Sequence, residues 1–119
     1  MTVDVPNGGF RTTVQDLRLR QWLLGPGQPT EVLDVFPEAG GGFHVVTDDR
    51  ADVHIASADG RFYLGWFPDG RPGAAREGWV LAVTGTARTP GYRIVFEPGT
   101  PARLVAATVS EVLATAPTR

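Results

Sequence analysis

The strongest constraint on the fold is a series of short alternating segments that fills the chain from residue 43 to residue 97. Within each segment, bulky apolar side chains alternate with small or polar ones, and turns rich in Gly, Asp and Pro separate the segments. Such short turns can connect only antiparallel strands, so the pattern predicts an antiparallel sheet. We expect strands at residues 43–46, 53–57, 61–67, 79–85 and 92–97.

The predicted connections between these strands differ in length. Asp59 and Gly60 suit a tight turn after Ser57, because Asp forms local side-chain hydrogen bonds and Gly tolerates positive φ. That turn predicts a hairpin between the second and third strands. Residues 68–78, in contrast, are expected to form a long mobile loop.

Two helices are predicted around the sheet. After the last strand, Thr100 is expected to cap a helix that Pro101 begins and Pro117 ends. A helix so rich in Val and Thr is not stable alone and must pack on the sheet. A shorter helix is expected before the sheet, with Thr30 as its N-cap and Pro37 as its end. The longer helix carries one stripe of apolar and small residues: Leu104, Val105, Thr108, Val109, Val112, Leu113 and Ala116.

The length of 119 residues suits a single domain with its own hydrophobic core. Residues 1–12 are polar and contain Pro6, so we expect a flexible lead-in followed by one domain over residues 13–119. Alternation within residues 14–24 favours a further strand at the start of this domain. The predicted fold class is α+β. It has a mainly antiparallel sheet of about five strands, a C-terminal helix on one face and a short helix before the sheet.

Alternation assigns the strand residues to two faces of the sheet. The helix face, expected under the C-terminal helix, holds the bulkier side chains: Val53, Ile55, Phe62, Leu64, Trp66, Trp79, Leu81, Val83, Tyr92, Ile94 and Phe96. The second face holds a smaller and mixed set: His54, Ala56, Tyr63, Gly65, Phe67, Val80, Ala82, Thr84, Arg93, Val95 and Glu97. This set is more apolar than a solvent face usually is, so we expect it to meet a partner, and a second copy of the sheet is the simplest candidate.

Composition limits the classes of partner. The net charge is −2, and the 11 basic residues are all arginines scattered along the chain, which argues against strong non-specific binding to duplex nucleic acid. The absence of cysteine excludes disulfides and cysteine-ligated metals. No apolar run approaches the roughly 20 residues that a membrane helix needs, so no membrane partner is expected.

No catalytic, metal or cofactor site is predicted. His44 and His54 flank an acidic stretch that contains Asp48, Asp49 and Asp52, but their spacing matches no compact ligand motif, and a solvated turn is expected. His54 could in principle serve Ser57 and Asp59 as the base of a small hydrolase. Positions 54 and 57 of one strand point to opposite faces, however, so these groups cannot meet. We therefore do not expect an enzyme.

A binding face is the remaining functional signal. Tyr63, Phe67 and Arg93 could form a stacking platform for bases on the second face, with Arg61 and Arg88 meeting phosphates at the strand ends. With Val95, the same face could instead pair with a second copy of the chain. The predicted function is thus a self-associating, non-catalytic module, and the alternative is single-stranded nucleic acid binding. Four antiparallel strands followed by a helix are also half of the whirly-type single-strand binding architecture, which is an analogy of fold alone.

Several stretches resemble the SPDY domain family over roughly residues 17 to 116. They comprise residues 24–27, the hairpin from Val53 to Trp66, Trp79 at the start of the next strand, and residues 96–102. The tetrad after which the family is named falls on Ser57-Ala58-Asp59-Gly60, which departs from the family pattern at its second and fourth positions. Ser57, Asp59 and the following Arg61 remain. The resemblance implies an actinobacterial protein in a cytoplasmic setting, without an assigned activity.

Overall fold

A computed structural model of the protein describes residues 23–37 and 41–115. The predicted lead-in over residues 1–12 lies outside the described residues, as does most of the predicted strand within residues 14–24. The described end of that stretch, Leu23 and Leu24, continues into residues 25–28 without regular secondary structure.

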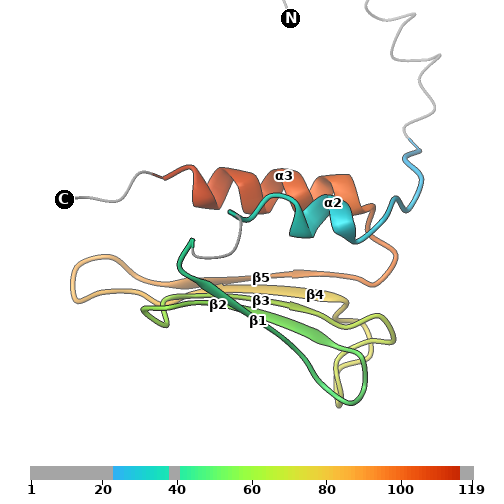
Figure 1. Ribbon diagram of the computed structural model, residues 1–119, viewed down its shortest axis with the longest axis horizontal. Coiled ribbons are helices and arrows are strands. Elements are labelled where there is room, and N and C mark those ends of the chain that lie inside the picture. The colour runs from blue at the N-terminus through green and yellow to red at the C-terminus, as the bar shows by residue number, and fades with distance from the viewer. Residues whose placement is uncertain (1–22, 38–40, 116–119) are drawn as a thin grey trace, which may run out of the picture.

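Five antiparallel strands form a meander in which each strand pairs with its neighbours in sequence (Figure 1). They are β1 (Phe43–Thr47), β2 (Val53–Ser57), β3 (Phe62–Trp66), β4 (Trp79–Val83) and β5 (Tyr92–Phe96). The helices α2 (Thr30–Leu33) and α3 (Ala102–Leu113) lie side by side on one face of this sheet (Figure 1). The predicted α+β class and its arrangement of helices are therefore confirmed.

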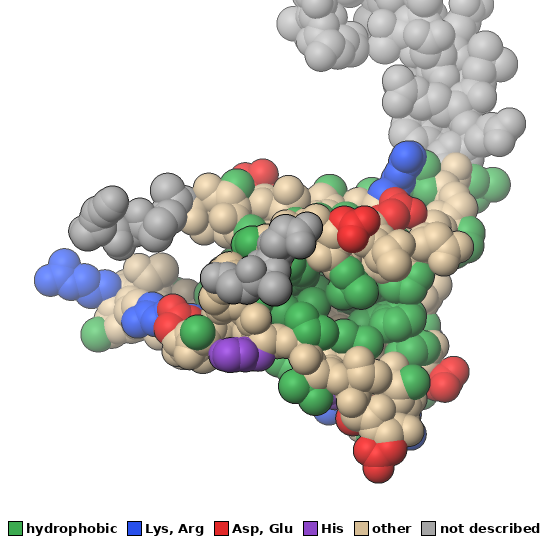
Figure 2. Space-filling view, in the orientation of Figure 1, with side chains coloured by type: hydrophobic (Ala, Val, Ile, Leu, Met, Phe, Trp, Pro, Cys, Tyr) green, Lys and Arg blue, Asp and Glu red, His purple; other side chains and the backbone are tan. Residues whose placement is uncertain are grey.

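The register confirms the predicted helix face. Ile55, Leu64, Leu81 and Ile94 are successive cross-strand partners at the centre of the sheet. These side chains pack with Val105 and Val109 of α3, and hydrophobic groups fill the space between the helices and the strands (Figure 2). Trp66 and Trp79 stack at the end of the same face, with ring centroids 5.7 Å apart. The core thus lies between one helix layer and one face of the sheet.

The helix ends differ from the sequence prediction. Pro101 is the N-cap of α3 and Thr100 makes no capping bond, while the helix ends at Leu113, before Pro117. In α2, Thr30 is the first helical residue and not the cap. The Glu31 carboxylate instead accepts the backbone N–H of Gln28 at 3.0 Å, so a side chain inside the helix satisfies a donor ahead of it.

The predicted stripe on α3 is largely confirmed, because Val105 and Val109 are buried and Val112 and Leu113 pack against the core, but Leu104 is not part of it. Leu104 is exposed, whereas Ala102 is buried and Ala106 packs at the margin of the core. Leu104 lies about 100° around the helix from Val105, and small alanines let the helix approach the bulky sheet closely on the other flank.

Residues 67–78, where the sequence predicts a long mobile loop over residues 68–78, form an extension of the β3–β4 hairpin that is held by backbone hydrogen bonds. At its base, the Phe67 N–H donates to the Gly78 carbonyl at 2.7 Å, and further along the Arg71 N–H donates to the Glu77 carbonyl at 2.9 Å. Arg71 and Ala74 form an isolated bridge near the tip. This hairpin extension curls below the sheet, away from α2 and α3 (Figure 1).

Gly65 provides a direct test of packing on the second face. A Cβ atom at this position would lie 2.7 Å from Cε2 of Phe67 and would also collide with the Tyr63 hydroxyl. We expect Gly65→Ala to destabilise the fold by roughly 1–3 kcal/mol, measured by urea unfolding, because the two rings must move. Gly25→Ala is the matched control, since nothing lies within 4 Å of its Cβ position. Equal midpoints for the two variants would contradict this packing.

Candidate functional site

The second face carries the side chains that the sequence assigns to a binding surface. Tyr63, Ala82 and Arg93 are successive cross-strand partners, and Gly65, Val80 and Val95 form the adjacent row. Tyr63, Phe67, Arg93 and Val95 therefore share one face, as their positions in the alternation predict.

The centre of this face is already covered by the chain itself. Phe67 and Val80 are only 5% and 4% exposed. The rings of Phe67 and Tyr63 lie over Gly65, which leaves room for them because it has no side chain. The hairpin extension is bonded to this face through Glu77, which pairs with Arg93, and through Arg76, which pairs with Glu97. The broad apolar surface that the sequence predicts is thus reduced to the two edges of the face, at Val46 on β1 and in a strip around Val95 on β5, and Phe67 is too deeply buried for a base to stack on its ring.

A hydrogen-bonded chain of three side chains crosses the other half of the face. Nε2 of His54 donates to Oδ2 of Asp48 at 2.9 Å, which fixes the tautomer because a carboxylate can only accept. In the neutral imidazole, Nδ1 is then the acceptor for the hydroxyl proton of Tyr63, at 2.8 Å. The Phe67 ring packs edge-on against the imidazole, with centroids 5.6 Å apart. His54 thereby links the β1–β2 turn to β3.

Asp48 is the point at which this chain joins the backbone. Its Oδ1 accepts the N–H groups of Arg50 at 2.9 Å and of Asp52 at 3.1 Å, so the carboxylate also shapes the turn. The hydrogen bond from His54 is the main reason that the pKa of Asp48 lies below its ordinary value. Burial raises the pKa of Tyr63, so its hydroxyl stays protonated and serves as a donor.

Sequence reasoning missed this chain of contacts. The sequence places Asp48 in a solvated turn, His54 on the second face of its strand and Tyr63 in a stacking platform, but it does not predict that they meet. The available signal was the predicted hairpin register, which sets His54 opposite Gly65 and therefore diagonal to Tyr63. A position with no side chain beside two aromatic residues indicates that the rings can fold over it.

Ion pairs connect the hairpin extension to β5. Nε of Arg71 donates to Oε1 of Glu77 at 2.6 Å, and an Nη of Arg93 donates to the same oxygen at 2.9 Å. The hydrogen bond from Arg71 is the main cause that lowers the pKa of Glu77. Arg76 pairs in the same way with Glu97, just beyond the end of β5. Arg93 is thus engaged within the chain, although its side chain remains half exposed.

The turn motif is accounted for by local hydrogen bonds. The Ser57 hydroxyl donates to Oδ1 of Asp59 at 2.6 Å and accepts the N–H of Phe62 at 3.0 Å. The same Asp59 oxygen accepts the N–H of Arg61, and Gly60 adopts a φ of +75° that a side chain would disfavour. Ser57 and Asp59 therefore bond to each other, while His54 bonds to Asp48 and Tyr63.

The remaining sequence candidates lie outside the chain of contacts from Asp48 to Tyr63. Arg61 and Arg88 are both exposed at the same end of the sheet, where the Thr84 N–H donates to the Arg61 carbonyl. Asp52 is buried and pairs with Arg50 at 3.1 Å. Within residues 23–37 and 41–115, no three His, Asp or Glu side chains come together as a metal site would require.

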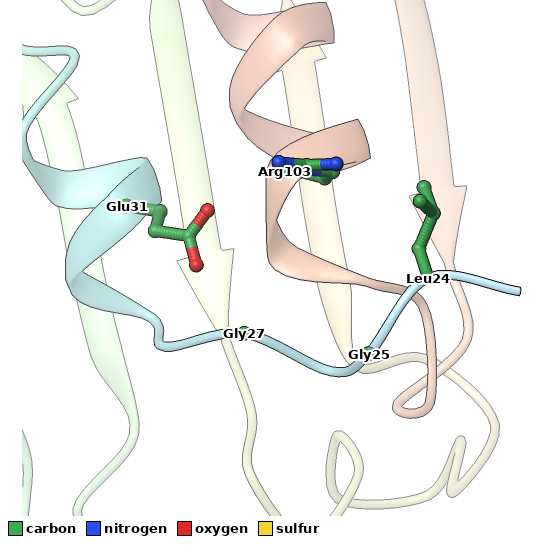
Figure 3. A pocket seen from close by; sticks show the side chains of 5 residues that line it. All are labelled: Leu24, Gly25, Gly27, Glu31 and Arg103. Carbon is green, nitrogen blue, oxygen red and sulfur yellow. The ribbon is translucent and has the colours of Figure 1, made fainter.

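A cavity of about 270 Å³ lies away from the second face, beside the start of α3 (Figure 3). Glu31 of α2 and Arg103 of α3 stand on its two sides, and Leu24, Gly25 and Gly27 complete its lining. Sequence reasoning did not predict this cavity, because it depends on how the segment before α2 crosses the start of α3.

Of the helices in the described ranges, none is long and apolar enough to cross a membrane.

These features define a two-layer α+β domain, in which a five-stranded meander carries two helices on one face and a polar network on the other. The sequence profile of the SPDY family, described as a domain of unknown function (DUF317), matches residues 56–118. The matched range covers more than half of the chain, from the end of β2 through α3, so the chain belongs to this family. The first part of the predicted resemblance, residues 17–55, lies outside the matched range. No curated protein and no solved structure matches the chain.

The network around Asp48 predicts a specific response to acid. Its lowered pKa means that the carboxylate stabilises the folded state above the ordinary value of 3.8 and loses this contribution as the pH falls through the lowered value. We expect Asp48→Asn to lower the melting temperature at pH 7 and to flatten the decline in stability below about pH 5, measured by circular dichroism.

Asp49→Asn is the control for this acid response. Asp49 is an exposed neighbour in the same turn, outside the chain of contacts to His54 and Tyr63. Its variant should follow the wild-type profile across the same pH range. Identical acid slopes for the wild type and Asp48→Asn would contradict the assigned role of the carboxylate.

Proposed function

We propose that this domain is a non-catalytic binding module that pairs with a second copy of itself through the uncovered strip of the second face on β5. The observation that supports it is the position of Val95. This side chain is 38% exposed on an edge strand, while Phe67 and Val80 at the centre of the same face are buried by the chain itself.

An edge strand with an exposed apolar side chain favours association. β5 pairs with β4 on one side only, so every second backbone N–H and C=O group of β5 lacks a strand partner among the described residues. Proteins that remain monomeric usually protect such an edge with a bulge, proline or inward-pointing charges. A second copy of β5 would satisfy the backbone groups and cover Val95 at the same time.

Single-stranded nucleic acid binding is the weaker alternative. Arg61 and Arg88 are exposed at one end of the sheet, as phosphate contacts would need. The proposed stacking groups argue against it, since Phe67 is buried and the Tyr63 hydroxyl is bonded to His54. An actinobacterial origin and a cytoplasmic setting stay predictions that the family resemblance alone implies.

Two valines on opposite edges allow a matched test of self-association. Val95→Glu places a charge at the proposed contact, whereas Val46→Glu places the same charge on β1, where Val46 is 57% exposed. We expect the wild type and Val46→Glu to dimerise in sedimentation equilibrium at high micromolar concentration, and Val95→Glu to remain monomeric, because burying an unpaired carboxylate is unfavourable.

The proposal fails if the wild type is a monomer throughout this concentration range. It also fails if the two variants dissociate equally, because the contact would then not involve β5 in particular. Circular dichroism of each variant checks that the domain remains folded.

A further inference from the structure

We propose that two copies pair antiparallel along β5, around a two-fold axis beside Val95, with Arg93 of each copy facing Glu97 of the other. This inference rests on the proposed self-association and specifies its geometry. It predicts a continuous sheet across the two copies, in which each second face is extended by the other.

The backbone of β5 provides the first argument. The Phe96 carbonyl accepts the N–H of Gly78, which precedes β4, at 2.8 Å. The N–H and C=O of one strand residue point to the same side, and successive residues alternate. Phe96 and Ile94 therefore direct their backbone groups toward β4, and Val95 and Arg93 direct theirs to the open edge. A two-fold axis beside Val95 lets the two copies of this residue exchange a pair of backbone hydrogen bonds.

The side chains on the second face provide the second argument. Along β5 and its continuation, Arg93, Val95 and Glu97 follow one another as a basic, an apolar and an acidic residue. When two such rows run antiparallel around Val95, the valines meet at the centre. Each arginine then lies opposite a glutamate, so the row is complementary to itself.

Other registers do not have this complementarity. An axis beside Arg93 or beside Glu97 would set like charges directly opposite each other. A shift of the axis by one residue, to Ile94, pairs Arg93 with Val95 and loses both charge contacts. In the proposed register, the helix face is also favourable, because Ile94 of one copy lies opposite Phe96 of the other, and both residues already pack at the margin of the core.

Arg93 and Glu97 already contact the hairpin extension, but both retain free surface. Their side chains are 49% and 63% exposed in pairs with Glu77 and Arg76. Glu77 and Arg76 lie in the same chain, so reversing Arg93 or Glu97 creates a like-charge contact inside each copy. If Arg93 and Glu97 serve only these intrachain pairs, mixing the two charge-reversed variants does not restore dimerisation. If they face each other between copies, mixing does restore it.

The experiment mixes two single charge reversals. Arg93→Glu homodimers place Glu opposite Glu97 twice, and Glu97→Arg homodimers place Arg opposite Arg93 twice. We expect each variant alone to dimerise at least roughly tenfold more weakly than the wild type. An equimolar mixture should form heterodimers of near wild-type affinity, because every facing pair is then opposite in charge. Sedimentation equilibrium and native mass spectrometry measure both results.

Cysteine cross-linking locates the axis independently. The chain has no cysteine, so Val95→Cys introduces a single thiol that faces its own counterpart at a Cα separation of about 5.5 Å, within the range of a disulfide. Val95→Cys should oxidise to a covalent dimer, whereas Val46→Cys on the opposite edge should not.

The possible results separate this geometry from the proposed function. A dimeric wild type whose charge-reversed variants fail to pair in the mixture, or whose Val95→Cys variant does not cross-link, overturns the register and leaves self-association standing. A monomeric wild type overturns both. Heterodimers in the mixture together with a Val95→Cys cross-link support the geometry. The intrachain contacts with Glu77 and Arg76 stay unfavourable in that mixture, so they cannot account for the restored dimerisation.

Discussion

Val105 and Val109 of α3, both without exposed surface, pack with Ile55, Leu64 and Leu81 at the centre of the sheet. Each such side chain contributes about 1.5–3 kcal/mol when it is removed from water, and an isolated helix of 12 residues is only marginally stable in water. The helix therefore depends on the sheet, and the sheet depends on the helix to cover its bulky face. Because one layer of helices can cover only one face, the chain must use other means on the second face. The hairpin extension and the network around His54 are those means.

The strands and their two faces could be predicted because one rule governs them. A period of two fixes which side chains share a face, and the tight turn from Ser57 to Gly60 fixes the register of the β2–β3 hairpin. Helix caps were predicted less well, because several nearby groups can satisfy the same backbone donors. Thr100 and Thr30 have the right chemistry, yet Pro101 and Pro29 occupy the capping positions. The energetic difference between these alternatives is small, and the path of the preceding segment decides between them.

The contacts of the second face were harder to predict because they join residues from three separate elements. Asp48 lies in a turn, His54 in β2 and Tyr63 in β3, and their meeting needs a turn that aims a carboxylate across the sheet. Residues 68–78 are rich in Gly and Pro, which favours a loop in any sequence-based prediction. Their folded course depends on bonds from Arg71, Arg76 and Glu77 that no local pattern contains. Composition therefore overestimated the open apolar surface, which is limited to the edges of the second face at Val46 and Val95.

The meander has a kinetic consequence. Every pair of strands is adjacent in sequence, so each hairpin closes a short loop and forms without waiting for a distant part of the chain. Folds with such local pairing have low contact order and reach the native state quickly for β-rich proteins. The docking of α3, in contrast, brings together residues far apart in sequence. The sheet can thus be largely assembled before its helix face is sealed, and the bulky row from Ile55 to Ile94 is transiently accessible to solvent during that interval.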